Sequence, residues 1–154
     1  MKHKKLLVII LGISIVLIDQ VLKGLLVEQN FEIIPNILNI TCTKNTGMAF
    51  GIGKSNLYII IIVNIIIIGA IIKILIDRGK HLDLKTLISL LLILSGGIGN
   101  LIDRLFRGYV IDYIDINILD FPNFNIADIS IALGIVLLII YIIKTMLSDK
   151  NKCK

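Results

Sequence analysis

The sequence predicts an all-α membrane protein with four transmembrane helices and a small β-rich cradle on one side of the membrane. Of its 154 residues, 56% are hydrophobic and 18% are charged, and the mean hydropathy is +0.96. Most charged residues lie outside four long apolar stretches, and many of the basic ones cluster beside those stretches. A soluble core of this length cannot bury so much apolar surface, whereas a bilayer can cover it.

A helix needs about 20 mostly apolar residues to cross roughly 30 Å of hydrocarbon. Four stretches meet this requirement: residues 6–27, 57–76, 86–106 and 126–143. Asp19 and Lys23 interrupt the first stretch, and Asp128 already lies inside the fourth. We expect these spans to form a single integral membrane domain over residues 1–154.

The beginning of the sequence also resembles the basic and apolar regions of a signal peptide. No small-residue cleavage site follows, and the apolar stretch resumes after Lys23. We therefore expect the first span to remain uncleaved.

The connections between the spans differ in charge. Basic residues precede the first span, separate the second from the third and follow the fourth: Lys2, Lys4, Lys5, Lys73, Arg78, Lys80, Lys85, Lys144, Lys150, Lys152 and Lys154. Cytoplasmic flanks carry this excess of lysine and arginine, so both termini are expected to be cytoplasmic. The basic residues form no helical stripe interleaved with aromatics, and the net charge of +5 therefore does not indicate a nucleic-acid partner.

The two outer segments, residues 28–56 and 107–125, are expected to differ in structure. Within the first, residues 37–43 partly alternate and are rich in β-branched side chains, which predicts a short strand. We expect this segment to form a small extracytoplasmic sheet, and residues 107–125 to form a short interfacial segment.

Ionisable groups within a membrane are expensive, and they mark function by default. Asp19, Asp103, Arg104 and Asp128 lie within the spans or at their ends, and Asp112 follows the third span. All five belong to the outer halves of helices or to the outer flank, so we expect them to converge.

The end of the third span combines small and polar residues. Gly96, Asn100, Asp103 and Arg104 recur at helical spacing and share one face. The glycines of this stretch allow another helix or a substrate backbone to come close. Asn100 can then offer amide hydrogen bonds at depth, and Arg104 supplies a positive charge near the outer boundary.

These residues also have structural interpretations. Asp19 and Lys23, four residues apart, form a natural intrahelical pair. Asp103 and Arg104 are able to pair at a helix crossing. Asn125 is a candidate N-cap of the fourth span. Asp128 would then lie in the first turn, where the helix dipole favours an acid.

Asp112 has a structural alternative and a competitor. It is readily explained as an acid in an interfacial loop, and Asp115, three residues on, competes with it for any chemical role.

The residues alone leave several function classes open. A proton or ion transporter would need polar groups across the whole bilayer, but the inner halves of the spans offer little beyond Asn64. A non-catalytic membrane subunit would use its polar faces only for packing. A serine nucleophile with a lysine base, built on Ser95 or Ser130, is disfavoured. Ser130 is only two residues from Asp128, so the two side chains lie on different faces of the helix and cannot act on the same bond. Two cysteines show no metal-binding spacing.

Five motifs together resemble the lipoprotein signal peptidase (signal peptidase II) family over essentially the whole chain. They are Asp19 with Lys23, and residues 44–50, 96–104, 108–112 and 124–128. The resemblance implies a bacterial aspartic endopeptidase of the cytoplasmic (inner) membrane with its active site near the outer face. Its substrate would be a diacylglyceryl-modified prolipoprotein, cut just before the lipid-modified cysteine.

The resemblance also implies roles for individual residues. It assigns catalysis to Asp112 and Asp128, which is why Asp112 is preferred over Asp115. It assigns substrate binding to Asn45, Asn100, Arg104 and Asn125, and we expect Asp19, Lys23, Gly96, Gly97, Gly99 and Asp103 to support the site. No metal or cofactor is expected. The implied partners are the prolipoprotein, membrane lipid and globomycin-type inhibitors, and the chain is expected to act as a monomer.

Overall fold

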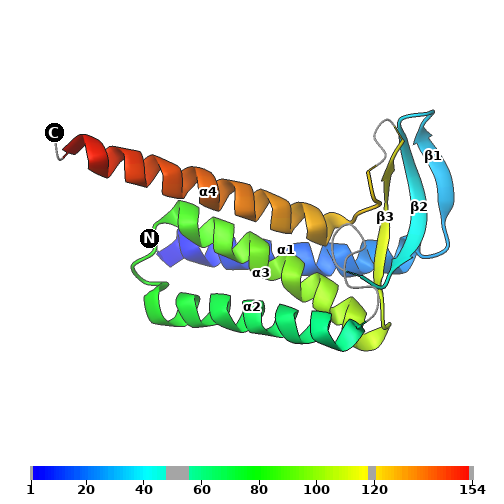
Figure 1. Ribbon diagram of the computed structural model, residues 1–154, viewed down its shortest axis with the longest axis horizontal. Helices are drawn as coiled ribbons and strands as arrows, with labels where there is room; N and C mark the ends of the chain where they lie inside the picture. The colour runs from blue at the N-terminus through cyan, green and yellow to red at the C-terminus, as the bar shows by residue number, and fades with distance from the viewer. Residues whose placement is uncertain (1, 48–55, 118–120, 153–154) are drawn as a thin grey trace.

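A computed structural model describes residues 2–47, 56–117 and 121–152 and shows a bundle of four helices with a three-stranded sheet at one end (Figure 1). The helices are α1 (Lys2–Leu26), α2 (Leu57–Arg78), α3 (Leu84–Phe106) and α4 (Ile126–Lys152), and the strands are β1 (Asn30–Ile34), β2 (Leu38–Asn45) and β3 (Val110–Ile116). The predicted fold class is confirmed. Residues 48–50 of the second motif and Cys153 lie outside the described residues.

All four helices of the described chain are long and apolar enough to cross a membrane. Aliphatic side chains such as Leu17, Ile66 and Leu133 are exposed along their outer surfaces. A bilayer can cover this surface, and a helix satisfies its own backbone hydrogen bonds there.

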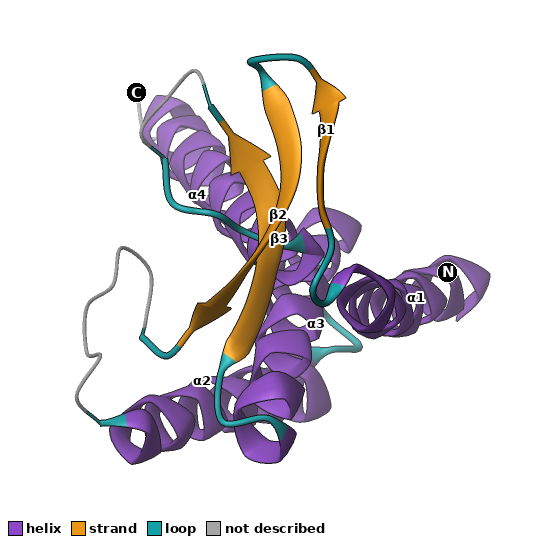
Figure 2. Ribbon diagram, turned by 90° about the vertical axis from the view of Figure 1, so that its right-hand side faces the viewer, coloured by secondary structure: helices purple, strands orange, loops and turns teal. Residues whose placement is uncertain are grey.

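Helix α3 is the central element, and it packs against each of the other three helices (Figure 2). Its small residues allow a close crossing with α4. A Cβ atom added at Gly96 would lie 2.2 Å from the carbonyl oxygen of Ala127, and one at Gly99 would lie 3.2 Å from the Ala127 Cβ. Gly97 faces α2 instead, where Asn64 donates to its carbonyl oxygen at 3.3 Å.

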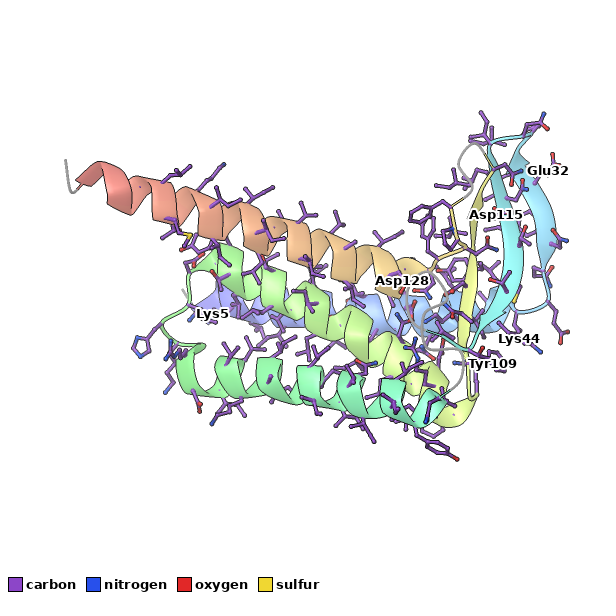
Figure 3. All side chains as sticks on the ribbon, in the orientation of Figure 1. Lys5, Glu32, Lys44, Tyr109, Asp115 and Asp128 are labelled. Carbon is purple, nitrogen blue, oxygen red and sulfur yellow. The ribbon has the colours of Figure 1, made fainter. Side chains whose placement is uncertain are left out.

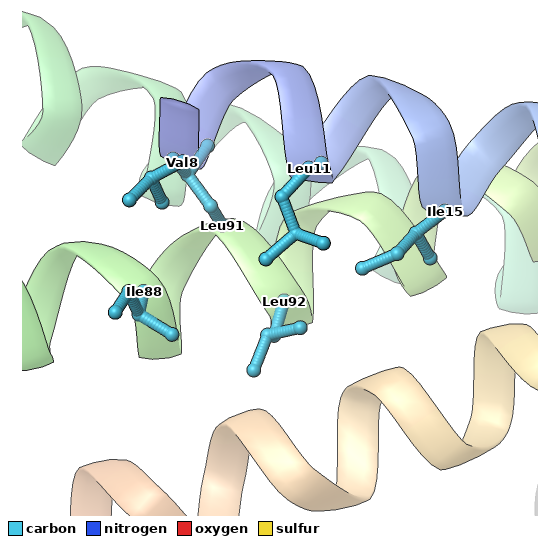
Figure 4. Close-up of a pocket in the computed structure, with 7 residues that line it drawn as sticks. Val8, Leu11, Ile15, Ile88, Leu91 and Leu92 are labelled. Carbon is cyan, nitrogen blue, oxygen red and sulfur yellow. The ribbon is translucent and has the colours of Figure 1, made fainter. Parts of the chain in front are cut away.

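The two ends of the bundle differ. Both chain ends and the connection between α2 and α3 lie at the end away from the sheet (Figure 1). In that half, α1 and α3 meet through aliphatic side chains (Figure 4). The contact consists of Val8, Leu11, Gly12, Ile15, Ile88, Leu91 and Leu92. The buried ionisable residues of the helices lie instead in the half toward the sheet.

The sheet is antiparallel, with strand order β1-β2-β3. Strand β2 contains the strand predicted over residues 37–43, apart from its first residue. Within the second outer segment, residues 107–125, Val110–Ile116 forms β3, a strand that the sequence pattern did not predict. The buried residues Val110–Tyr113 are covered on both faces of the strand, so the alternating pattern that marks a half-exposed strand is missing.

The chain returns along β3 before it enters α4. The backbone N–H of Phe124 donates to the carbonyl of Ile114 at 3.1 Å, and the N–H of Ile114 donates back at 2.9 Å. This return brings the start of α4 beside the middle of β3.

Candidate active site

Asp112 is a buried strand residue, not an acid in an interfacial loop. It is 2% exposed and lies opposite Thr43 in the sheet. Its two carboxylate oxygens accept hydrogen bonds from the side-chain amides of Asn45 at 2.9 Å and Asn125 at 2.6 Å. Asp115 lies farther along the strand and is partly exposed (Figure 3).

Asp128 lies in the first turn of α4, at the end of the bundle that faces the sheet (Figure 3). The side chain of Asn125 accepts from the Asp128 N–H at 2.9 Å, and Asp128 accepts from the Asn125 N–H at 3.2 Å. This reciprocal arrangement is a capping box, so the predicted cap is confirmed. The other carboxylate oxygen of Asp128 accepts from the Asn100 side chain at 2.7 Å.

Asn125 therefore connects the two acids. It is fully buried, its side-chain N–H group donates to Asp112, and its backbone N–H donates to Asp128. An acid from the sheet and an acid from α4 are thus held on either side of a single residue.

The electrostatic setting of Asp112 favours its protonated form. Burial and the neighbouring Asp128 carboxylate raise the pKa of Asp112 to about 6, against the opposing effect of the hydrogen bonds from Asn45 and Asn125. A carboxyl group in this range can exchange a proton near neutral pH, as general acid–base catalysis requires.

Arg104 adds a positive charge next to the pair. Its guanidinium donates to the carbonyl of Gly47 at 2.9 Å and interacts electrostatically with Asp112 and Asp128. The alternative in which Asp103 pairs with Arg104 at a helix crossing is not found. Consecutive residues point about 100° apart around a helix, and Asp103 pairs elsewhere.

Asp19, Lys23 and Asp103 form a fully buried charge cluster. The Lys23 ammonium lies 2.9 Å from Asp19 and 3.0 Å from Asp103. The predicted pair of Asp19 and Lys23 is confirmed, and the structure adds Asp103 to it. The same ammonium donates to the side-chain carbonyl of Asn100 at 3.0 Å.

Sequence reasoning assigned no role to Gln20 or Arg107. The Gln20 amide lies 3.2 Å from both Asp19 and Asp103. Arg107 pairs with Asp103 and donates to the Gln20 side-chain oxygen at 3.0 Å. The i, i+4 spacing of Asp103 and Arg107 could have predicted their ion pair. Nothing in the sequence around Gln20 indicates its contacts.

The candidate serine nucleophiles are engaged elsewhere. Ser95 donates to the carbonyl of Leu91 at 2.6 Å, and Ser130 donates to the carbonyl of Leu92 at 2.8 Å. Within the residues described, no group of three His, Cys, Asp or Glu side chains is placed to hold a metal ion.

Comparisons with known proteins relate the whole chain to one family. A family profile described as "Signal peptidase (SPase) II" matches residues 11–144. The chain is similar to the lipoprotein signal peptidase of Staphylococcus aureus, with 39% identity over 97% of this chain and 98% of that protein. The lipoprotein signal peptidase of the bovine strain RF122 is 37% identical over the same shares.

Two solved structures resemble the fold. One, titled as a bacterial membrane enzyme structure at 2.3 Å resolution, has a TM-score of 0.83 and 36% identity, and the match covers 94% of this chain and 90% of that chain. A second, titled in the same way at 1.9 Å resolution, has a TM-score of 0.79 and 36% identity, covering 92% and 94%.

Proposed function

The chain belongs to the signal peptidase II family, and we propose that Asp112 and Asp128 are the catalytic pair of an aspartic endopeptidase. The function of the chain is the removal of signal peptides from prolipoproteins. One observation carries the assignment of the pair: Asn125 donates to Asp112 through its side chain and to Asp128 through its backbone.

The chemistry follows from two neighbouring carboxylates. Such groups cannot both ionise cheaply, so they share one proton. The ionised member takes a proton from a water molecule, whose oxygen adds to the scissile carbonyl carbon, while the protonated member donates to the carbonyl oxygen. The C–N bond then breaks, and a proton passes to the leaving amine. The acid and base roles belong to the pair as a unit.

The surrounding polar residues are suited to position a peptide at this pair. Asn45 donates to Asp112 and Asn100 donates to Asp128, so both amides lie beside the reacting carboxylates. The Arg104 guanidinium offers a positive charge with several N–H donors, which suits peptide carbonyls and the polar groups of a lipid. We assign substrate binding to these three residues and Asn125.

The substrate is a prolipoprotein that carries a diacylglyceryl-modified cysteine, and the cut falls immediately before that cysteine. The acyl chains of such a substrate would remain in the bilayer and hold the scissile bond at the membrane surface. The sheet and the pair lie at the outer face of the inner membrane in this proposal, which the excess of basic residues in the other connections supports. The protein acts there as a monomer, and it binds membrane lipid and globomycin-type inhibitors.

Two other functions use the same acids differently. A proton or ion transporter requires a polar path, but α1 and α3 meet through aliphatic side chains in the half of the bundle away from the sheet (Figure 4). A non-catalytic subunit would use the polar residues only for packing. Neither alternative predicts cleavage by the purified protein.

The experiment uses purified protein in detergent with a diacylglyceryl-modified precursor and with the same precursor unmodified. We expect mass spectrometry to show a cut immediately before the modified cysteine, no cut in the unmodified precursor, and inhibition by globomycin. Equal cleavage of both precursors would contradict the lipid requirement. Ion flux in liposomes without cleavage would favour a transporter, and neither activity would favour a non-catalytic subunit.

A further inference from the structure

Three buried ionisable side chains lie next to the catalytic pair and take no part in the proposed proton transfers. The side chains of Asp19, Lys23 and Asp103 are all 0% exposed. Burial of charges is costly even when they are paired, and ionisable groups within a membrane mark function by default. The contacts of the cluster therefore indicate what it does.

Each carboxylate of the cluster holds the backbone immediately before one of the proposed catalytic acids. Asp103 accepts from the N–H of Ile111 at 3.2 Å, and Ile111 precedes the acid on β3. Asp19 accepts from the N–H of Ala127 at 3.0 Å, and Ala127 precedes the acid on α4. The cluster is thus anchored at matching positions, one residue before each acid.

Lys23 joins the two anchors, because its ammonium contacts both Asp19 and Asp103. It also reaches the pair through Asn100. The ammonium donates to the Asn100 side-chain oxygen at 3.0 Å, and the Asn100 amide donates to Asp128 at 2.7 Å. Since an ammonium only donates, it fixes the Asn100 amide with its N–H group toward Asp128.

We propose that Lys23 is a positioning residue that fixes the separation of the two catalytic carboxylates by holding Asp19 and Asp103 together. This inference rests on the proposed catalytic roles of Asp112 and Asp128. Lys23 itself donates to neither acid, and it acts on them through the anchored backbone and Asn100.

The ionisable groups in and around the pair come from four elements. They are Asp19 and Lys23 on α1, Asp103, Arg104 and Arg107 on α3, and Asp112 on β3 with Tyr113 beside it, facing Asp128 on α4. Lys23 and the adjacent Arg107 together balance the charges of Asp19 and Asp103. Removal of Lys23 alone leaves two buried carboxylates that repel each other and draw the anchors apart.

The shape of the pH–rate profile reports the separation of the catalytic carboxylates. Closely held carboxylates share a proton over a wide pH range, which gives a broad bell-shaped profile. If the carboxylates move apart, their coupling weakens. The acid and alkaline limbs of the pH–rate profile then lie closer together, and the profile becomes narrower. A general loss of folded protein lowers the height of the profile and leaves its width unchanged.

The test compares Lys23→Met with a charge-balanced double variant, Lys23→Met with Asp19→Asn. In the double variant, the side-chain amide oxygen introduced at position 19 can still accept from Ala127, and the Asp103–Arg107 pair remains. The variant loses the Lys23 ammonium with its contacts to both anchors and to Asn100, while the Gln20 amide stays between positions 19 and 103. Asn64→Leu is the matched control, because it removes a hydrogen bond between α2 and α3 that touches neither the cluster nor the pair.

The readout is kcat and KM for a diacylglyceryl-modified precursor across pH. For both Lys23 variants we expect kcat to fall about 10- to 100-fold and KM to change by a smaller factor, because Lys23 reaches the substrate-binding residues only through Asn100. We also expect the pH–rate profile of both Lys23 variants to become narrower by about one pH unit. The profile of Asn64→Leu should keep the wild-type width.

An unchanged width in the double variant would overturn the positioning role of Lys23. Such a result would leave the catalytic pair standing if Asp112→Asn and Asp128→Asn are inactive in the same assay. Normal activity in either of those two variants would instead overturn the proposed function.

Discussion

The side-chain amide of Asn125 lies 2.6 Å from the carboxylate of Asp112, so the residue that caps α4 also holds an acid on β3. This double role can be separated by mutation. A serine at position 125 can supply the capping oxygen, but it is too short to replace the amide that reaches Asp112.

Asn125→Ser should therefore retain stability and lose activity. Asn125→Ala should lose both, with about 1 kcal/mol less stability than the serine variant because the cap is missing. Thermal unfolding in detergent and cleavage assays on the same preparations provide the comparison. Equal stability of the two variants would contradict the capping role, and near-normal cleavage by Asn125→Ser would contradict the holding role.

Replacement of Asn45 should move the pH dependence of cleavage. The hydrogen bond from Asn45 stabilises the ionised form of Asp112 and lowers its pKa. In Asn45→Val, the pKa of Asp112 rises further, and the alkaline limb of the pH–rate profile should move up by about one unit. Thr43→Val is the control, because Thr43 contacts only the backbone oxygen of Asp112. A shift toward lower pH would refute this assignment.

Asp112 should destabilise the folded protein at neutral and alkaline pH. Because burial raises the pKa of Asp112 from 3.8 to about 6, its contribution to stability is present below pH 3.8 and lost as the pH rises through 6. Asp112→Asn should therefore be more stable than wild type at pH 8, by ~2 kcal/mol at most.

This gain should shrink as the pH falls toward 4. The difference in apparent unfolding temperature between Asp112→Asn and wild type, recorded in detergent at pH 8 and pH 4, measures the gain. Asp115→Asn is the control, because Asp115 is partly exposed on the same strand. A gain that is independent of pH would show that relief of packing, and not of charge burial, stabilises Asp112→Asn.

Neighbouring glycines in α3 should differ sharply in their tolerance of alanine. At Gly96 a Cβ would meet the carbonyl oxygen of Ala127 at 2.2 Å, whereas at Gly97 the nearest atom is a side-chain carbon of Ile68 at 3.5 Å. We expect Gly96→Ala to cost about 1–3 kcal/mol and to impair cleavage, because it displaces α4 and its acid. Gly97→Ala should be neutral or slightly stabilising. Similar unfolding temperatures for the two variants would be inconsistent with the close α3–α4 crossing.

Much of the fold can be predicted from the sequence, because each helix that crosses a bilayer needs a run of about 20 mostly apolar residues. Long apolar stretches predicted all four helices, and the intrahelical spacing of Asp19 and Lys23 predicted their ion pair. Local chemistry also predicted the cap, because Asn125 and Asp128 have the residue types and the spacing that a helix start needs.

The remaining features depend on contacts between distant segments. Strand β3 forms by pairing with β2, and its double-sided burial removes the alternation that would have marked it. The contact of Asp103 with Lys23 depends on how α1 and α3 are rotated about their axes, which hydropathy does not encode. The choice of Asp112 over Asp115 came from a family resemblance, and burial of Asp112 supplies a physical reason for it.

The most direct test of the proposed catalytic pair is single-turnover cleavage of a diacylglyceryl-modified precursor by purified Asp112→Asn, Asp128→Asn and Asp115→Asn. We predict that the first two variants remain folded and lose roughly 1,000-fold or more of the wild-type rate, while Asp115→Asn cleaves at close to that rate. Cleavage near the wild-type rate by either Asp112→Asn or Asp128→Asn would contradict the account.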